Sequence, residues 1–149
     1  MGAWWVNNQS DEAKKSRAER DDPEGVEEIC EEVGAALDAW EPAAECDTED
    51  DFVEDLSEYL LDETGFEIEV CPDTAEGQPD ILIEDRLALE MKIDPSRSGR
   101  DRCVGQCAGY SREWVTWIVL VDAPASKVGR LVRLLKDKGL EPILVWNFA

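Results

Sequence analysis

Three charged residues, Asp80, Glu90 and Lys92, stand among apolar residues in the stretch GQPDILIEDRLALEMKID. Glu90 and Lys92 are two positions apart, so in a strand both would lie on the face opposite to Met91. Two neighbouring carboxylates suit a hard cation such as Mg²⁺, and an amine beside them can orient a water, help to remove its proton or offset charge on a phosphate. These residue types together predict metal-dependent hydrolysis of a phosphodiester.

Each of the three residues also has a simpler explanation. Asp80 could cap a strand, Glu90 could lie on a solvated face, and Lys92 could serve only as the ion-pair partner of Glu90. However, Glu90 lies between Leu89 and Met91 in what reads as a central strand, where a metal or an ion pair must compensate a buried charge. We therefore predict that Asp80 and Glu90 bind the metal and that Lys92 is catalytic.

A hairpin would bring these residues together. With a tight turn at Asp85 and Arg86, Asp80 would lie opposite Met91, within one position of the other two charges.

The remaining elements follow from hydrophobic spacing, capping residues and turn signals. We expect helices over 23–40, 48–65, 101–114 and 126–138, strands over 66–70, 80–84, 87–93, 117–121 and 142–146, and a loop over 96–100. This order predicts an α/β fold with a mixed central sheet flanked by helices.

The composition excludes several classes of site. The chain has 149 residues and no histidine, which removes serine triads, Cys-His pairs and histidine zinc sites. Its five cysteines form no CxxC pair, which argues against a disulfide framework or a zinc knuckle. No apolar run is long enough to span a membrane, and the first residues do not read as a signal peptide. We expect a cytoplasmic protein.

The acidic charge is strong and uneven. The net charge is −21, and residues 21–65 carry 19 acids and no base. Such an excess fits solubility in high salt, a disordered tail or a surface that mimics DNA. Scarce lysine with acids spread over a chain of ordinary apolar content is typical of cytoplasmic proteins of halophilic archaea.

The motif Pro79-Asp80 followed by Glu90-Met91-Lys92 resembles the PD-(D/E)xK motif of the restriction-endonuclease-like nuclease superfamily. The order of elements is similar to that family's α-β-β-β-α-β core, and the pattern is nearest to archaeal Holliday junction resolvases and Mrr-like nucleases. The resemblance covers about residues 48–149. It implies a restriction-endonuclease-like fold with an extra N-terminal helix, and a site that uses Mg²⁺ or Mn²⁺ on DNA.

The resemblance also implies residues outside the motif. Family members often carry an acid on the helix before the first strand, and counting back eleven positions from Gly65-Phe66 gives Glu54 as a further metal ligand and catalytic residue. A glutamine on the helix after the motif strand matches Gln106, with Tyr110 on the same helical face. Glu54 could equally be a solvated acid, and Gln106 an ordinary polar helix residue.

Basic residues near the motif are candidates for contacts with nucleic acid. Arg97, Arg100 and Arg102 follow the motif strand closely and could grip phosphates, with Tyr110 nearby. A solvated loop is the alternative for these arginines. The basic residues of the last helix form at most a modest stripe, for which a solvated face is the simpler explanation.

We divide the chain into a flexible arm (1–22), an acidic helix and linker (23–47) and a nuclease domain (48–149). The expected function is a Mg²⁺-dependent DNA endonuclease of repair, recombination or restriction. A catalytically inactive nuclease-fold module for protein interaction or DNA binding is the main alternative, and an acidic DNA mimic is a third. DNA is the expected partner, and the family resemblance allows a homodimer; no membrane and no nucleotide cofactor are expected.

Overall fold

Six strands form one mixed sheet in the computed structural model, which describes residues 2–4, 15–140 and 143–148. In spatial order the strands are β1 (Gly2–Trp4), β6 (Leu144–Phe148), β5 (Val115–Val121), β4 (Leu87–Ile93), β3 (Ile81–Ile83) and β2 (Ile68–Val70). Strand β3 is antiparallel to both of its neighbours, β2 and β4, whereas β4, β5 and β6 are parallel, and β1 is antiparallel to β6. The expected mixed α/β architecture is confirmed, with β1 as an additional strand.

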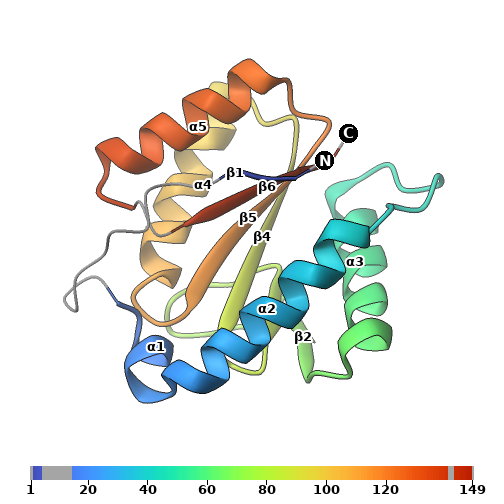
Figure 1. The fold of residues 1–149 in the computed structure, drawn as a ribbon. Helices are drawn as coiled ribbons and strands as arrows, with labels where there is room; N and C mark the ends of the chain where they lie inside the picture. Colours follow the sequence, from blue (N-terminus) through green and yellow to red (C-terminus); the bar gives the residue numbers. More distant parts are fainter. Residues whose placement is uncertain (1, 5–14, 141–142, 149) are drawn as a thin grey trace.

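Helices cover both faces of this sheet (Figure 1). The helices are α1 (Arg17–Asp21), α2 (Pro23–Ala39), α3 (Glu49–Thr64), α4 (Arg97–Tyr110) and α5 (Ala125–Asp137). Helices α2 and α3 pack on one face, with Leu89 and Met91 of β4 in their shared core. Helices α4 and α5 pack on the other face, against Ile118 and Leu120 of β5. Both faces of β5 are therefore covered, which explains its continuous apolar run.

Local capping signals set the ends of α3. Thr48 accepts a hydrogen bond from the backbone of Asp51, whose side chain bonds back to the Thr48 backbone in a capping box. At the other end, Gly65 adopts a left-handed φ of 70°, which glycine tolerates without steric cost. The helix expected over 48–65 is thus present as Glu49–Thr64.

Helix α4 begins and ends about one turn earlier than expected. The segment 96–100, expected as a loop, is the first turn of this helix. Ser96 is its N-cap and accepts a hydrogen bond of 3.1 Å from the backbone N–H of Gly99. The helix then ends at Tyr110 rather than at Trp114.

The β3–β4 turn also lies one residue earlier than expected. Glu84 and Asp85 both have positive φ, and the Arg86 N–H donates to the Ile83 carbonyl at 2.9 Å. Ile81 pairs with Leu89, so Asp80 lies one step beyond this pair, toward Glu90 rather than opposite Met91. In this register Asp80 lies one residue closer to Glu90 than the expected turn would place it.

The segment before α2 is attached to the sheet layer. Part of the arm expected over 1–22 is helix α1, and Gly2–Trp4 is strand β1; residues 5–14, which include Trp5, lie outside the described part. The Arg17 guanidinium forms ion pairs with Glu113 at 2.7 Å and with Asp85 at 3.3 Å. Helix α2 shares its hydrophobic core with α3. Among the described helices, none has the length and apolarity needed to cross a bilayer.

Candidate functional site

Strand β4 presents its two charged residues to the layer formed by α4. Side chains alternate along a strand, and Leu89 and Met91 face the core under α2 and α3. Ala88 packs with Tyr110 on the opposite face, so Glu90 and Lys92 point to the α4 side. Asp80 precedes β3 and lies beside the middle of β4.

Lys92 is paired with Glu90, and Asp80 is hydrogen-bonded to the backbone of the residue that lies between them. The Lys92 Nζ lies 3.5 Å from Glu90 Oε2, and the backbone N–H of Met91 donates to Asp80 Oδ2 at 2.7 Å. Glu90 is 2% exposed. Its other oxygen, Oε1, is buried and accepts no hydrogen bond from the described residues. The structure therefore gathers Asp80, Glu90 and Lys92 into one cluster, which we call the carboxylate–lysine cluster.

Burial perturbs both carboxyl groups of this cluster. Burial first, and then the charge of Asp80, raises the pKa of Glu90 from 4.5 to about 7, although Lys92 opposes the rise. Burial also raises the pKa of Asp80, against the lowering effect of the Met91 hydrogen bond. Strongly perturbed carboxyl groups with a specific charged partner are typical of functional sites.

Lys92 is held in its charged form. Burial acts to lower its pKa, but the charges of Glu90, Glu49 and Asp80 outweigh this effect, and the pKa lies above its usual value. At neutral pH the side chain is therefore an ammonium group. It is suited to offset negative charge at the site rather than to act as a base.

Glu54 of α3, expected as a further metal ligand, is not among the acids whose charge acts on the cluster. Glu54 is exposed and lines a separate hollow of about 230 Å³ with other acids, between α3 and the segment 43–46 that precedes it. The acids of α3 whose charge acts on Asp80 are Glu49 and Asp50, in the first turn. Glu49 lies one turn before Val53 at the head of the buried stripe of α3, and this spacing is the sequence signal that could have identified it.

Helix α4 contributes mostly buried groups. Gln106 is half-buried, and its Oε1 accepts no hydrogen bond from the described residues. Cys103 and Cys107 are free thiols on the buried face. A hydrogen bond with Cys103 and burial both raise the pKa of Cys107, so this thiol stays protonated. The cysteines act here as small core residues, as expected.

Two of the residues expected to touch nucleic acid are buried. Tyr110 is 2% exposed and packs on Trp114 with ring centroids 6.3 Å apart, so its ring belongs to the core and not to a binding surface. Arg100 is 8% exposed, and its Nη1 donates to the Pro95 carbonyl at 3.2 Å. Arg97 and Arg102 are exposed as expected. The earlier start of α4 places position 100 on its inner side.

The cluster fits a divalent cation held by two carboxylates. No group of three or more Asp, Glu or Cys side chains in the described part of the chain is arranged as a complete metal site. Mg²⁺, however, is commonly bound through only one or two carboxylates, with waters and substrate phosphates as the other ligands. The buried Glu90 Oε1 without a hydrogen bond and the paired raised pKa values agree with such a ligand set.

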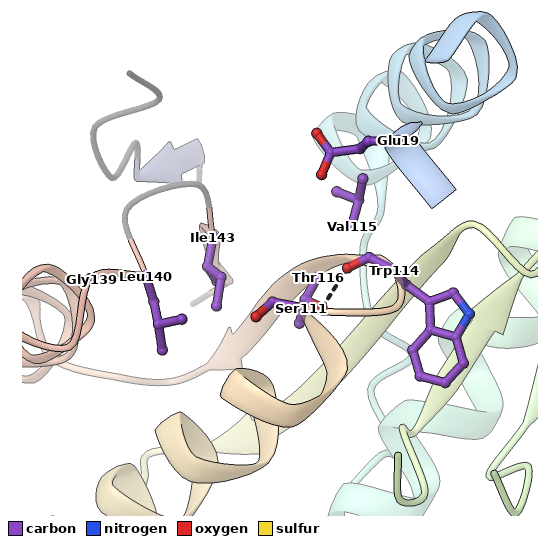
Figure 2. Close-up of a pocket in the computed structure, with 8 residues that line it drawn as sticks. All are labelled: Glu19, Ser111, Trp114, Val115, Thr116, Gly139, Leu140 and Ile143. Carbon is purple, nitrogen blue, oxygen red and sulfur yellow. Dashed lines mark hydrogen bonds between the residues drawn. The ribbon is translucent and has the colours of Figure 1, made fainter. Parts of the chain in front are cut away.

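A small cavity elsewhere offers no comparable chemistry. It has a volume of about 70 Å³ and lies near the C-terminal end of α4 and the end of α5 (Figure 2). Glu19, from α1, is the only charged residue among the described residues that line it, and the Thr116 hydroxyl donates to the Trp114 carbonyl at 3.2 Å. The carboxylate–lysine cluster is therefore the stronger candidate site.

No protein-family model, curated protein or solved structure matches the chain.

Proposed function

We propose that the protein is a Mg²⁺-dependent nuclease that hydrolyses DNA phosphodiester bonds. The observation that carries the proposal is the buried Glu90 beside the half-buried Asp80, with Lys92 Nζ 3.5 Å from Glu90 Oε2 and with Glu90 Oε1 accepting no hydrogen bond from the described residues. Two desolvated acids of like charge are costly to keep together without a cation. A pair of carboxylates in this setting is therefore better explained by a function than by a contribution to folding stability.

The topology supports the more specific fold proposal. Helix α3 is followed by three antiparallel strands, helix α4 and strand β5 parallel to β4. This order agrees with the α-β-β-β-α-β core of restriction-endonuclease-like nucleases that the motif implies. We include that fold in the proposal, with α2 as the additional N-terminal helix.

Each residue of the cluster has a distinct role in the proposed reaction. Asp80 and Glu90 would hold the cation, which when bound supplies Lewis-acid polarisation of a phosphate oxygen. The Lys92 ammonium would stabilise negative charge on the phosphate in the transition state. Glu49, at the start of α3, would add negative charge beside the cation. Gln106 remains a candidate for orienting water or phosphate from α4.

Cleavage in the presence and absence of divalent cations tests this function. Purified protein is expected to nick or cut plasmid DNA with Mg²⁺ or Mn²⁺, and to leave it intact in EDTA. The Asp80→Asn protein should bind Mn²⁺ more weakly in calorimetry because one carboxylate is lost. If the wild-type protein neither binds Mn²⁺ nor cuts DNA, the chain is better explained as a non-catalytic module.

The two candidate acids of α3 give a matched pair of variants. Glu49→Gln is expected to weaken Mn²⁺ binding about 3- to 10-fold, because its charge acts on Asp80 and Lys92. Glu54→Gln removes the same charge from another exposed position on the same helix, whose charge does not act on Asp80 or Lys92, and should change the affinity less than about 2-fold. Calorimetric titration of both variants measures the difference. A larger loss in Glu54→Gln would restore Glu54 as the ligand.

A further inference from the structure

The two helical layers of the protein carry opposite charge. Counted over their bounds, α2 and α3 contain 14 acids and no base, whereas α4 and α5 contain seven bases and two acids. These layers lie on opposite faces of the sheet (Figure 1). In a chain of net charge −21, the α4–α5 side is therefore a locally basic face.

A groove on this face gathers four arginines from two helices. It has a volume of about 240 Å³ between the N-terminal half of α4 and the outer side of α5. The lining residues are Arg97, Arg100, Asp101, Arg130, Arg133, Leu134 and Asp137. Four arginines and two acids thus line this hollow, which we call the arginine groove.

Most of these arginines have no partner within the protein. In the described part of the chain, Arg97, Arg130 and Arg133 form no ion pair and no side-chain hydrogen bond. Arg100 uses one N–H on the Pro95 carbonyl, which fixes its position in the wall of the groove. Surface arginines left unpaired in a protein so rich in acids are available for an external anion.

Arg97 and Arg100 also lie at a helix end where basic residues are ordinarily unfavourable for stability. Both lie in the first turn of α4, which contains no acid, although the positive end of the helix dipole favours acids there. An anion in the groove would be attracted by the side chains and by this helix end together. The basic first turn is thus better explained by binding than by stability.

The groove is fixed relative to the carboxylate–lysine cluster. Strand β4 carries Glu90 and Lys92 and leads through Asp94 directly into α4. The Lys127 ammonium of α5 pairs with Asp94 at 2.6 Å, which joins the first turn of α5 to the end of β4.

We infer that the arginine groove binds the phosphodiester backbone of duplex DNA, with Arg97, Arg130 and Arg133 as the contacting residues. The groove is a site of electrostatic positioning and reads no base sequence. The inference rests on the proposed nuclease function only for the choice of DNA as the nucleic acid. It extends the expected contact surface from α4 to α5.

Fluorescence anisotropy with a labelled DNA duplex in EDTA tests the groove without cleavage. Arg130→Ala and Arg133→Ala should each weaken binding about 3- to 10-fold. In the double variant, the slope of log affinity against log KCl concentration should fall by about 2, because two phosphate contacts are lost. Arg112→Ala, an exposed arginine beyond the other end of α4, is the control and should change affinity less than about 2-fold.

The outcomes separate this inference from the nuclease proposal. If wild type fails to bind the duplex, or if the double variant binds with unchanged affinity and salt slope, the groove assignment is wrong even when the protein cuts DNA. If wild type binds through these arginines but never cuts, the groove stands and the nuclease proposal fails. Tighter groove-dependent binding of duplex RNA than of DNA would overturn the choice of DNA. Arg130→Lys with Arg133→Lys keeps the charge and should retain most of the salt slope, which distinguishes loss of charge from loss of folding.

Discussion

The Glu90→Gln protein is expected to lose DNA cleavage and yet to be more stable than wild type in metal-free buffer. Cleavage should fall by about 10²- to 10³-fold, as when one group that organises transition-state charge is removed. Above about pH 7, stability should rise by about 1–3 kcal/mol, because a buried, desolvated carboxylate becomes a neutral amide of the same shape. Asp80 then remains to balance the charge of Lys92. Plasmid cleavage and urea unfolding measure the two effects.

Glu69→Gln is a suitable control for this variant. Glu69 is exposed on the neighbouring edge strand β2, so the same substitution there should leave both cleavage and stability close to wild type. Opposite changes in activity and stability are expected when a residue is kept for function at a cost to the fold. Wild-type cleavage by Glu90→Gln would remove Glu90 from the proposed metal ligands.

The stability of the metal-free protein should fall with rising pH through the titration of Glu90. The folded state binds this proton with a pKa of about 7, against 4.5 as the usual value. Between these values the folded state holds more protons than the unfolded state, so the free energy of unfolding decreases as pH increases. From about pH 5 to about pH 8, wild type should lose about 3 kcal/mol relative to Glu90→Gln.

Unfolding curves in EDTA at several pH values measure this difference. Subtracting the Glu90→Gln curve removes the contribution of the many exposed acids, which both proteins share. Glu69→Gln should follow wild type, and addition of Mg²⁺ at about pH 8 should restore part of the lost stability because the cation binds the ionised, folded form. Parallel pH profiles for wild type and Glu90→Gln would show that Glu90 titrates normally.

The sequence was most informative where signals are local. Thr48 and Gly65 mark the ends of α3, and the alternation around Glu90 and Lys92 predicts which face of β4 each residue occupies. Strand β4 has the bounds expected from its pattern. Such features depend on residues within one turn or one strand of each other, and their physical causes are contained in that short segment.

Features that depend on packing between elements were less predictable. Helix α4 has few large apolar residues to mark its inner side, and three glycines within it weaken the pattern; its start and the burial of Tyr110 were therefore missed. Strand β1 is only three residues long and pairs with β6 at the far end of the chain. Glu54 was predicted as the metal ligand of α3 from its spacing to Gly65. The buried stripe of α3 instead points to Glu49, which lies one turn before Val53 at the start of that stripe.

The opposite charges of the two helical layers have a consequence for how the protein would meet DNA. The molecule is an electric dipole directed across its sheet, so the field of a polyanion exerts a torque on it. Near DNA, the acidic α2–α3 side would be turned away, and the α4–α5 side would lead during diffusion. Many encounters would then begin with the groove already facing the duplex. Salt screens this preference over about 10 Å at 0.1 M and about 3 Å at 1 M, so the orienting effect should act only in the last steps of approach in concentrated salt.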